Sequence, residues 1–597
     1  MNKNFETGDN MIRETDHPMP CEVKTLYGSD AMAEMLRQLD MPYVALNPGS
    51  SFRGLHDSIV NYLGNKDPHM LLCLHEEHAV SIAHGWAKVT GRPMAVVLHA
   101  NVGLMHAAMA IYNAWCDRVP MLIFGATGPV DAAKRRPWID WLHTSRDQAA
   151  IVRPYVKWDD QPASLSASLS SMMRAMTITT SAPMAPTYVC FDVTVQETAV
   201  DAMPALPDPA RHAAPEAPAA SAGQVAALTR MLAEAKAPVI LMGRVSRDAE
   251  DWARRMALAE HFNARVITDI KTGAAFPTRH NLHVGAPGFF PSTDSIEALK
   301  AADLVLCLDW VDPAGTLAQA MPMRAEAKVV NATLEPMLTN GWSMDHQDVV
   351  ASDLTILTEP DALVAALCER LDLEPATAMP RTAPTAHGQD PDEVLSLDAL
   401  SHVLRAGLAE DEHTLVRLPL GWDGRHCDFT GPLDYLGYDG GAGISSGPGM
   451  VVGAALALKG TGRMPVAVLG DGDFIMGATA LWTATHQHVP MLIVVANNRS
   501  FFNDEIHQER VARDRDRPIE NKHIGQAIDE PDIDIAALAR AQGAEGIGPV
   551  GTVADFEAAL ERAVSMVRAG QAVVIDARIL RGYVKEMVEG MTAEQDD

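Results

Sequence analysis

Positive charge, cysteine and long apolar runs are all scarce in this sequence of 597 residues. Its 48 Lys and Arg residues are outnumbered by 77 Asp and Glu residues, so the formal net charge is −29. That balance argues against binding to nucleic acid or to an anionic membrane surface. The seven cysteines include no CxxC pair, which is typical of reduced thiols. Because no run of about 18 apolar residues occurs and the polar N-terminus lacks an apolar signal core, we expect a cytoplasmic protein without a membrane span.

What the chain does contain is ordinary for large α/β proteins, with 47% hydrophobic and 21% charged residues. Two Pro- and Ala-rich stretches, 201–222 and 374–392, are typical of linkers. They divide the chain into blocks 22–200, 223–373 and 393–597. Each block alternates short apolar strands with amphipathic helices. We therefore predict an α/β fold of three doubly wound domains with parallel sheets.

The third block contains Gly470-Asp471-Gly472 at one end of a segment and Asn497-Asn498 at the other. Between and before them, the pattern predicts a strand at 465–469, a helix at 478–487 and a second strand at 491–496. A lone GDG is ordinarily a turn. Here the two glycines allow backbone amides to approach an anion, and carboxylate and amide oxygens are ligands that Mg²⁺ or Ca²⁺ prefers. The whole segment predicts an anion and metal site at the carboxyl ends of parallel strands.

The first block contains His75-Glu76-Glu77-His78 between an expected strand at 71–74 and a helix at 79–89. From the residues alone, the two glutamates favour the positive end of a helix dipole. The two histidines also suggest a metal site, but without a third ligand they are weak evidence for zinc.

Taken together, the strand–GDG–helix–strand–NN segment and the later Gly85-Trp86-Ala87 step resemble the thiamine-diphosphate-dependent decarboxylase and acetolactate synthase family. The resemblance implies that a divalent ion, Mg²⁺ or Ca²⁺, holds the cofactor's diphosphate. It places the metal ligands at Asp471, Asn498 and a backbone carbonyl near Ser500, with Gly470, Gly472 and Asp473 beside the diphosphate. It also places Glu76, rather than Glu77, at the catalytic position, where a carboxyl bonded to the pyrimidine ring promotes ylid formation.

One branch of the family, benzoylformate decarboxylase, offers the closest likeness in appearance. The loop Asn47-Pro48-Gly49-Ser50 resembles its substrate-carboxylate loop, with Ser50 as the binding residue. The strand end at 97–100 resembles the one that carries an active-site histidine, which makes His99 the candidate proton donor or acceptor at the substrate. From the residues alone, a turn serine and a core histidine explain these positions equally well. In the third block, Gly443 and Ile444 match the point where a bulky apolar side chain supports the bent cofactor.

Three departures from the family pattern matter. Asp473 stands where a small residue is common, so we expect it to face the metal shell or a helix N-terminus. Residues 418–422 lack the hydroxyl and amide side chains that often bind the diphosphate, so backbone amides would serve instead. The stretch that lines the substrate in relatives predicts either a solvated loop or a pocket for a more polar substrate than phenylglyoxylate, because it contains Asn503, Asp504 and His507.

The resemblance implies non-oxidative decarboxylation of a 2-oxo acid through a ylid and an enamine. Carboligation of the acetolactate synthase type is the alternative, and a catalytically inactive regulatory paralogue is a hypothesis from another class. FAD and a nicotinamide cofactor are not expected, because the middle block, 223–373, contains no GxGxxG. The family's assembly implies a homodimer or a dimer of dimers, with Glu76 and Asp471 meeting across a subunit interface.

Overall fold

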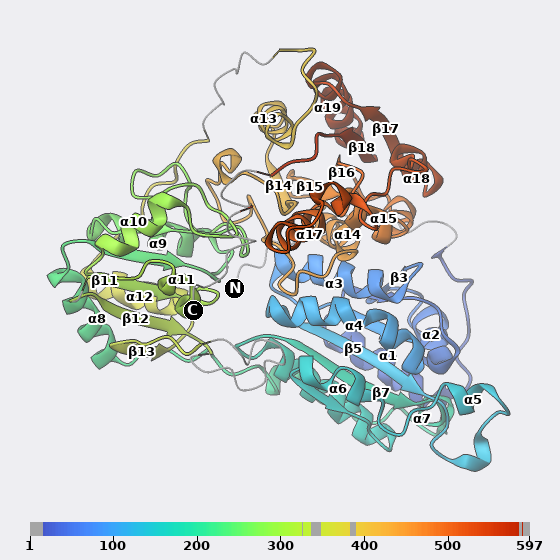
Figure 1. Cartoon of the computed structure of the whole chain (residues 1–597). Coiled ribbons are helices and arrows are strands. Elements are labelled where there is room, and N and C mark those ends of the chain that lie inside the picture. Colours follow the sequence, from blue (N-terminus) through green and yellow to red (C-terminus); the bar gives the residue numbers. More distant parts are fainter. Residues whose placement is uncertain (1–15, 325, 336–347, 382–389, 584–587, 589–597) are drawn as a thin grey trace.

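The computed structural model describes residues 16–324, 326–335, 348–381, 390–583 and 588, and Figure 1 labels its elements. Three parallel sheets, each within one of the three expected blocks, form the framework. Alternate residues of strand β4, Ala95–Leu98, belong to two different core clusters, so both faces of its sheet are buried. The predicted α/β class with doubly wound parallel sheets is confirmed, whereas the exact domain limits remain predictions.

The first sheet has six strands in the order β3-β2-β4-β5-β7-β6, all paired in parallel. A short antiparallel pair, β1 with β8, closes this domain. Its remaining strands are β1 (Leu26–Tyr27), β2 (Tyr43–Leu46), β3 (His69–Leu72), β5 (Met121–Thr127), β6 (Trp158–Asp160), β7 (Pro186–Asp192) and β8 (Ala199–Val200). Its helices are α1 (Gly28–Gln38), α2 (Arg53–Asp57), α3 (Glu76–Thr90), α4 (Ala100–Cys116), α5 (Ile139–Leu142), α6 (Leu165–Thr180) and α7 (Val193–Glu197).

The central sheet has five parallel strands in the order β10-β9-β11-β12-β13. They are β9 (Pro238–Met242), β10 (Arg265–Ile267), β11 (Leu304–Leu308), β12 (Lys328–Thr333) and β13 (Leu354–Leu357). The helices are α8 (Ala222–Glu234), α9 (Ala249–His261), α10 (Thr293–Ala301), α11 (Pro313–Ala318) and α12 (Pro360–Leu371). The predicted linker at 201–222 ends where α8 begins. In the second predicted linker, 374–392, residues 382–389 lie outside the described part of the chain.

The third sheet also has five parallel strands, in the order β14-β15-β16-β18-β17. They are β14 (His413–Arg417), β15 (Met464–Gly470), β16 (Met491–Asn497), β17 (Glu545–Val550) and β18 (Ala572–Arg578). The helices are α13 (Leu397–Gly407), α14 (Ser446–Leu458), α15 (Asp471–Gly477), α16 (Ala480–His486), α17 (Phe502–Asp514), α18 (Ile535–Ala541) and α19 (Val553–Arg568). None of the helices within the described ranges is long and apolar enough to cross a membrane.

Two local features of this domain differ from what the sequence pattern suggests. The predicted turn at Gly470–Gly472 is the start of helix α15, because Gly470 is the extended N-cap and Asp471 is already helical. Carboxylates suit a helix N-terminus, so Asp471 and Asp473 favour this start despite the intervening glycine. The stretch from Phe502 onward forms helix α17, which excludes the solvated loop, one of the two alternatives for these residues.

The first and third domains pack against each other along helices α3 and α14, which lie side by side at the centre of Figure 1. Glycines make the approach close: a Cβ on Gly85 would lie 2.0 Å from the Met450 carbonyl oxygen, and one on Gly453 would lie 1.8 Å from the Ile82 carbonyl oxygen. Neither contact is tolerable for a side chain. The Gly85-Trp86-Ala87 step therefore has a packing reason, since glycine lets the two helices touch.

Candidate active site

The carboxyl ends of β15 and β16 bring the two predicted metal ligands together. The strands are parallel neighbours, with Gly470 opposite Ala496, so the residues that follow them emerge at one edge of the sheet. The backbone N–H of Ser500 donates to Asp471 Oδ2 at 3.1 Å and to Asn498 Oδ1 at 3.0 Å. Asn497 turns away and donates to Asp576 at 2.8 Å. Of the two asparagines, Asn498 is thus the one that faces Asp471, and its role as a metal ligand stays a prediction.

The Asp471 carboxylate is buried, with 4% of the residue exposed. Burial raises the pKa of Asp471 to about 6, although backbone amides, including those of Gly472 and Ser500, pull it down. Within the described residues, no ion pair to this carboxylate is formed. A buried carboxylate without a cation, beside an amide oxygen, is a donor set that suits Mg²⁺ or Ca²⁺. The residues therefore fit the divalent ion that the family implies.

A cavity of about 290 Å³ opens beside these ligands. Its walls include Ile444, Asp473, Asn503 and Asp504, together with Asp471 and Asn498. Ile444 is half-buried, so it faces the cavity and is not an ordinary core isoleucine. Of the predicted substrate-lining residues, Asn503 and Asp504 lie in the wall, but His507, further along α17, is not among the residues that line it.

The backbone on either side of Ile444 is unusual. Ala442 and Ser445 both have left-handed conformations, with φ of 53° and 96°. Such conformations cost free energy in residues other than glycine, and they cluster at functional sites. Here they hold Gly443 and Ile444 in a fixed loop between β14 and α14, which fits the supporting role predicted for Ile444.

Asp473 lies at a helix N-terminus, which is one of the two positions expected for it from the sequence. Its Oδ1 accepts hydrogen bonds from the backbone N–H groups of Ser445, at 2.8 Å, and Gly447, at 3.3 Å, where α14 begins. Its Oδ2 lies 3.2 Å from Arg417 Nε. Burial raises the pKa of Asp473, whereas Arg417 lowers it. Arg417 is a site residue that the sequence analysis missed, one position before the segment in which diphosphate ligands were sought.

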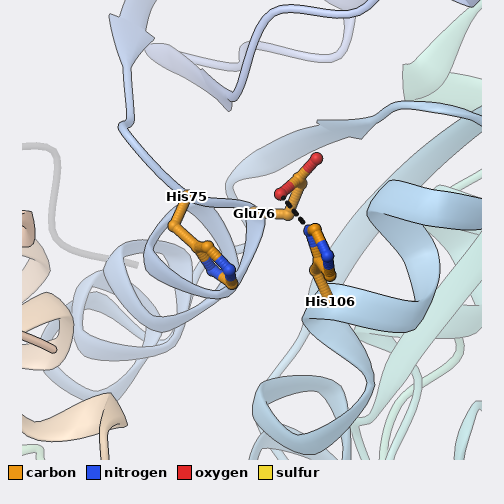
Figure 2. A group of neighbouring side chains, drawn as sticks. All are labelled: His75, Glu76 and His106. Atoms are coloured by element: carbon orange, nitrogen blue, oxygen red, sulfur yellow. Dashed lines mark hydrogen bonds and ion pairs between the residues drawn. The ribbon is translucent and has the colours of Figure 1, made fainter. Parts of the chain in front are cut away.

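Glu76 begins helix α3, with 9% of its side chain exposed. Its Oε2 lies 3.0 Å from Nδ1 of His106 on helix α4 (Figure 2). Gly103, one turn earlier on α4, makes room for this carboxylate, because a Cβ there would lie 3.0 Å from Glu76 Oε1. His106 was not predicted, and its distance in sequence from Glu76 concealed it.

The histidines around Glu76 differ from the zinc pattern considered from the sequence. His75 is the N-cap of α3, where its Nδ1 accepts a hydrogen bond from the Glu77 backbone N–H at 3.2 Å. Its ring stacks on His106, with centroids 4.9 Å apart. His78 instead points to Thr479 of the third domain, with Nε2 2.7 Å from the hydroxyl. The group in Figure 2 is thus His75, Glu76 and His106, and capping and hydrogen bonding account for it.

The adjacent glutamates have separate surroundings. Glu77 bonds to the Ser445 hydroxyl of the third domain, next to Ile444. Burial raises the pKa of Glu77, partly offset by this hydrogen bond. Glu76 lies against α4 of its own domain, whereas Glu77 joins α3 to the loop that supports the cavity. The contacts of Glu76 and Glu77 therefore distinguish the two residues, whereas in the sequence only the family resemblance does so.

His99 follows β4 and is held at both ring nitrogens. Its Nδ1 lies 2.9 Å from the Ser51 hydroxyl, and its Nε2 lies 3.2 Å from Nδ1 of His143. Burial lowers the pKa of His99, and His143 lowers it further. Gly49 packs directly on this ring, because a Cβ there would lie 2.3 Å from His99 Cβ.

Ser50, the predicted carboxylate-binding residue, lies next to this group but not within it. Ser50 is exposed, and its carbonyl accepts a hydrogen bond from Arg53 at 3.0 Å. The structure thus brings buried Ser51, rather than Ser50, to His99, and it adds His143. The role of Ser50 at the substrate stays a prediction.

Glu76 and His99 do not reach the cavity. Among the described residues, its walls come from the third domain alone, between Leu397 and Tyr583. One chain thus presents two separate groups: the cavity with Asp471, and the first-domain group with Glu76 and His99.

Comparison with known proteins agrees with this geometry. Models of the thiamine pyrophosphate enzymes match the chain in three places: the N-terminal TPP binding domain at 26–151, the central domain at 225–339 and the C-terminal TPP binding domain at 420–577. These matches define a three-domain enzyme that binds thiamine diphosphate. The chain belongs to the thiamine pyrophosphate enzyme family, which confirms the resemblance seen in the sequence.

Individual relatives are more distant. A benzoylformate decarboxylase of Pseudomonas aeruginosa is 25% identical over 91% of this chain and 97% of its own length. An acetolactate synthase large subunit of Corynebacterium glutamicum is 25% identical over 79% of this chain and 75% of its own length. The solved structure of a 4-hydroxybenzoylformate decarboxylase from Rhodococcus jostii matches with a TM-score of 0.73 and 21% identity, over 94% of this chain and 100% of that one.

Proposed function

We propose that this protein catalyses the non-oxidative decarboxylation of a 2-oxo acid with thiamine diphosphate and a divalent metal ion. The observation that carries the proposal is the meeting of Asp471 and Asn498 at one backbone N–H, that of Ser500, beside a cavity walled by Ile444. Bound thiamine diphosphate supplies the carbon nucleophile and accepts the electron pair left when carbon dioxide departs.

The residues of this chain have distinct tasks in that reaction. The metal ligands are Asp471, Asn498 and the Ser500 carbonyl. Glu76 binds the pyrimidine ring and holds a proton at its carboxyl group. Ile444 and Gly443 support the cofactor, and the diphosphate is bordered by Gly470, Gly472 and Asp473. Ser50 orients the substrate carboxylate. His99 exchanges a proton at the reacting carbon.

The substrate that fits best is a 2-oxo acid with a polar substituent. Asn503 and Asp504 lie in the wall of the cavity, beside Phe501 and Phe502. An apolar phenyl ring would leave the two polar groups unpaired in a confined space, which costs free energy. His507 remains a candidate substrate residue, which helix α17 places further along than the two wall residues.

We infer that a second copy of the chain completes the site. In the described part of the chain, no first-domain residue lines the cavity, and Glu76 lies elsewhere in the same chain. Beside Glu76, helix α4 exposes Met105 by 56% and Met109 by 39%, and the His106 side chain is 57% exposed. Apolar residues exposed in such a row suit a protein interface. A homodimer, or a dimer of dimers, would bring Glu76 of one copy to Asp471 of the other.

Carboligation is the second candidate function, because acetolactate synthases cover most of this chain at similar identity. The two activities differ only in whether a proton or a second carbonyl compound meets the activated carbon. A panel of 2-oxo acids, with mass spectrometry of the products, separates them when run with and without an added aldehyde. We expect an aldehyde product from a polar 2-oxo acid. Binding of thiamine diphosphate without turnover of any acid would instead support a regulatory paralogue.

A further inference from the structure

The cavity beside Asp471 has an unusual charge balance for a site that binds a diphosphate. Three carboxylates, those of Asp471, Asp473 and Asp504, belong to its wall. Among the described residues of that wall, Arg417 is the only Lys or Arg. A divalent ion held by Asp471 offsets part of this negative charge. The cation beside Asp473 is Arg417, so an anion that enters the cavity depends on this pairing.

Arg417 is held firmly where it can act on that anion. It ends strand β14, and 2% of its side chain is exposed. Its guanidinium lies 2.6 Å from Asp439 and 3.2 Å from Asp473, and 4.2 Å above the ring of Tyr438. The planar guanidinium suits such paired and stacked contacts, which a lysine does not reproduce.

The two carboxylates beside Arg417 are fixed independently of it. Asp439 accepts a hydrogen bond from the Ser446 hydroxyl at 2.8 Å, and Asp473 accepts the two backbone N–H groups that begin α14. One guanidinium thus faces two carboxylates, and Asp473 is the one next to Asp471. Without Arg417, the described residues would offer neither buried carboxylate a cation, and the negative charge that they carry would repel a diphosphate.

We infer that Arg417 is a positioning residue of the cofactor site, which neutralises Asp473 and so allows the cavity to accept a diphosphate. This inference rests on the proposed function. It also gives the missing diphosphate side chains of 418–422 a replacement. Arg417 and Asp473 act as a coupled pair, in which the charge of each residue offsets the buried charge of the other.

The experiment is a double-mutant cycle on cofactor affinity, measured by titration calorimetry of cofactor-free protein with thiamine diphosphate and Mg²⁺. The variants are Arg417→Gln, Asp473→Asn and the double variant. Arg255→Gln is the matched control, because Arg255 is also fully buried and paired with an aspartate, Asp361, but lies in the central domain. Thermal unfolding of each cofactor-free variant separates loss of fold from loss of affinity.

We expect Arg417→Gln to weaken binding at least tenfold relative to the wild type, whereas the same exchange in the Asp473→Asn background should change it by less than threefold. The double variant should recover most of the loss, because it removes the charge of Asp473, which is the carboxylate that lines the cavity. Arg255→Gln should reduce stability without changing affinity. Where Arg417→Gln does not fold, comparison of the double variant with Asp473→Asn carries the test, and a difference below threefold supports the pairing. The inference is overturned if Arg417→Gln binds as the wild type does, or if the double variant binds at least tenfold more weakly than Asp473→Asn. Failure of wild-type protein to bind the cofactor would refute the proposed function itself.

Discussion

Replacement of His143 tests how this chain prepares His99. The backbone N–H of Ser51 points at His99 Nδ1 from 3.4 Å, and an amide can only donate. The Ala100 N–H donates to the Ser51 hydroxyl at 3.1 Å, which leaves the hydroxyl hydrogen for the same ring nitrogen. Nδ1 is therefore the unprotonated nitrogen of His99, and the neutral imidazole carries its proton on Nε2. His143 Nδ1 accepts that proton in a hydrogen bond of 3.2 Å.

The expected loss of activity on replacing His143 follows from this one hydrogen bond. A neutral hydrogen bond inside a protein contributes about 1 kcal/mol net, which is about fivefold in a rate or a population. His143→Phe keeps a ring but removes the acceptor, so we expect kcat to fall about fivefold. His143→Asn places an amide oxygen where Nδ1 was, so it should stay within about twofold of the wild type. The Michaelis constant should change little in either variant, because His143 acts through His99.

The assay is steady-state decarboxylation of the 2-oxo acid that the substrate panel identifies. His261→Phe on helix α9 is a control for general effects of the exchange, since this exposed histidine lies in the central domain. Full activity in His143→Phe would refute the reasoning. So would equal losses in the Phe and Asn variants, because the acceptor atom would then not matter.

Three other predictions concern the helix that carries Glu76 and its surroundings. Glu76→Gln should bind cofactor but lose hydrogen exchange at the thiazolium carbon by at least about 100-fold, whereas Glu77→Gln should retain it; nuclear magnetic resonance of the exchange decides, and similar rates for both would contradict the assignment. Gly85→Ala should lower the free energy of unfolding by about 1–3 kcal/mol, because its Cβ would clash with Met450. Gly223→Ala on α8 should not, because its Cβ would make only an ordinary contact of 3.9 Å with the Ser221 hydroxyl; denaturant titration measures both. Burial lowers the pKa of His78 from 6.5 to about 4. Above pH 6.5 the histidine is neutral in both states, and between pH 6.5 and 4 only the unfolded chain takes the proton. Stability should therefore fall by about 3 kcal/mol through this window as the pH drops, and His78→Gln should remove that part of the slope.

The sheets were predictable because their strands are buried on both faces. Residues 491–496 form a continuous apolar run that predicts a strand. The observed strand β16 is one residue longer and ends at Asn497. The start of α15 was missed for an equally physical reason. Gly470 and Gly472 suggest a turn, but aspartates at 471 and 473 stabilise a helix N-terminus, and this preference prevails here.

The candidate site was only half predictable, because motifs record neighbours in sequence and a fold joins distant residues. Asp471 and Asn498 are separated by one βαβ unit, so the strand order places them together. His106 and His143 come from other elements, and only the fold brings them to Glu76 and His99. Arg417 left one signal in the sequence, because a charged residue at the end of an apolar strand implies a buried partner.

The separation of Glu76 from the cavity has a consequence for the assembly. Helices α3 and α14 already pack tightly within one chain, through glycines that admit no side chain. Small rearrangements of this interface cannot carry Glu76 to Asp471. The backbones of the two helices already touch at Gly85 and Gly453, so neither helix has room to slide past the other. Under the proposed function, the complete site takes its first domain from a second copy of the chain, and the exposed Met105 and Met109 beside Glu76 are the surface proposed for that contact. On this reasoning, dilution that separates the subunits should abolish turnover, while the diphosphate half with Asp471, Asn498 and Arg417 stays intact in each chain.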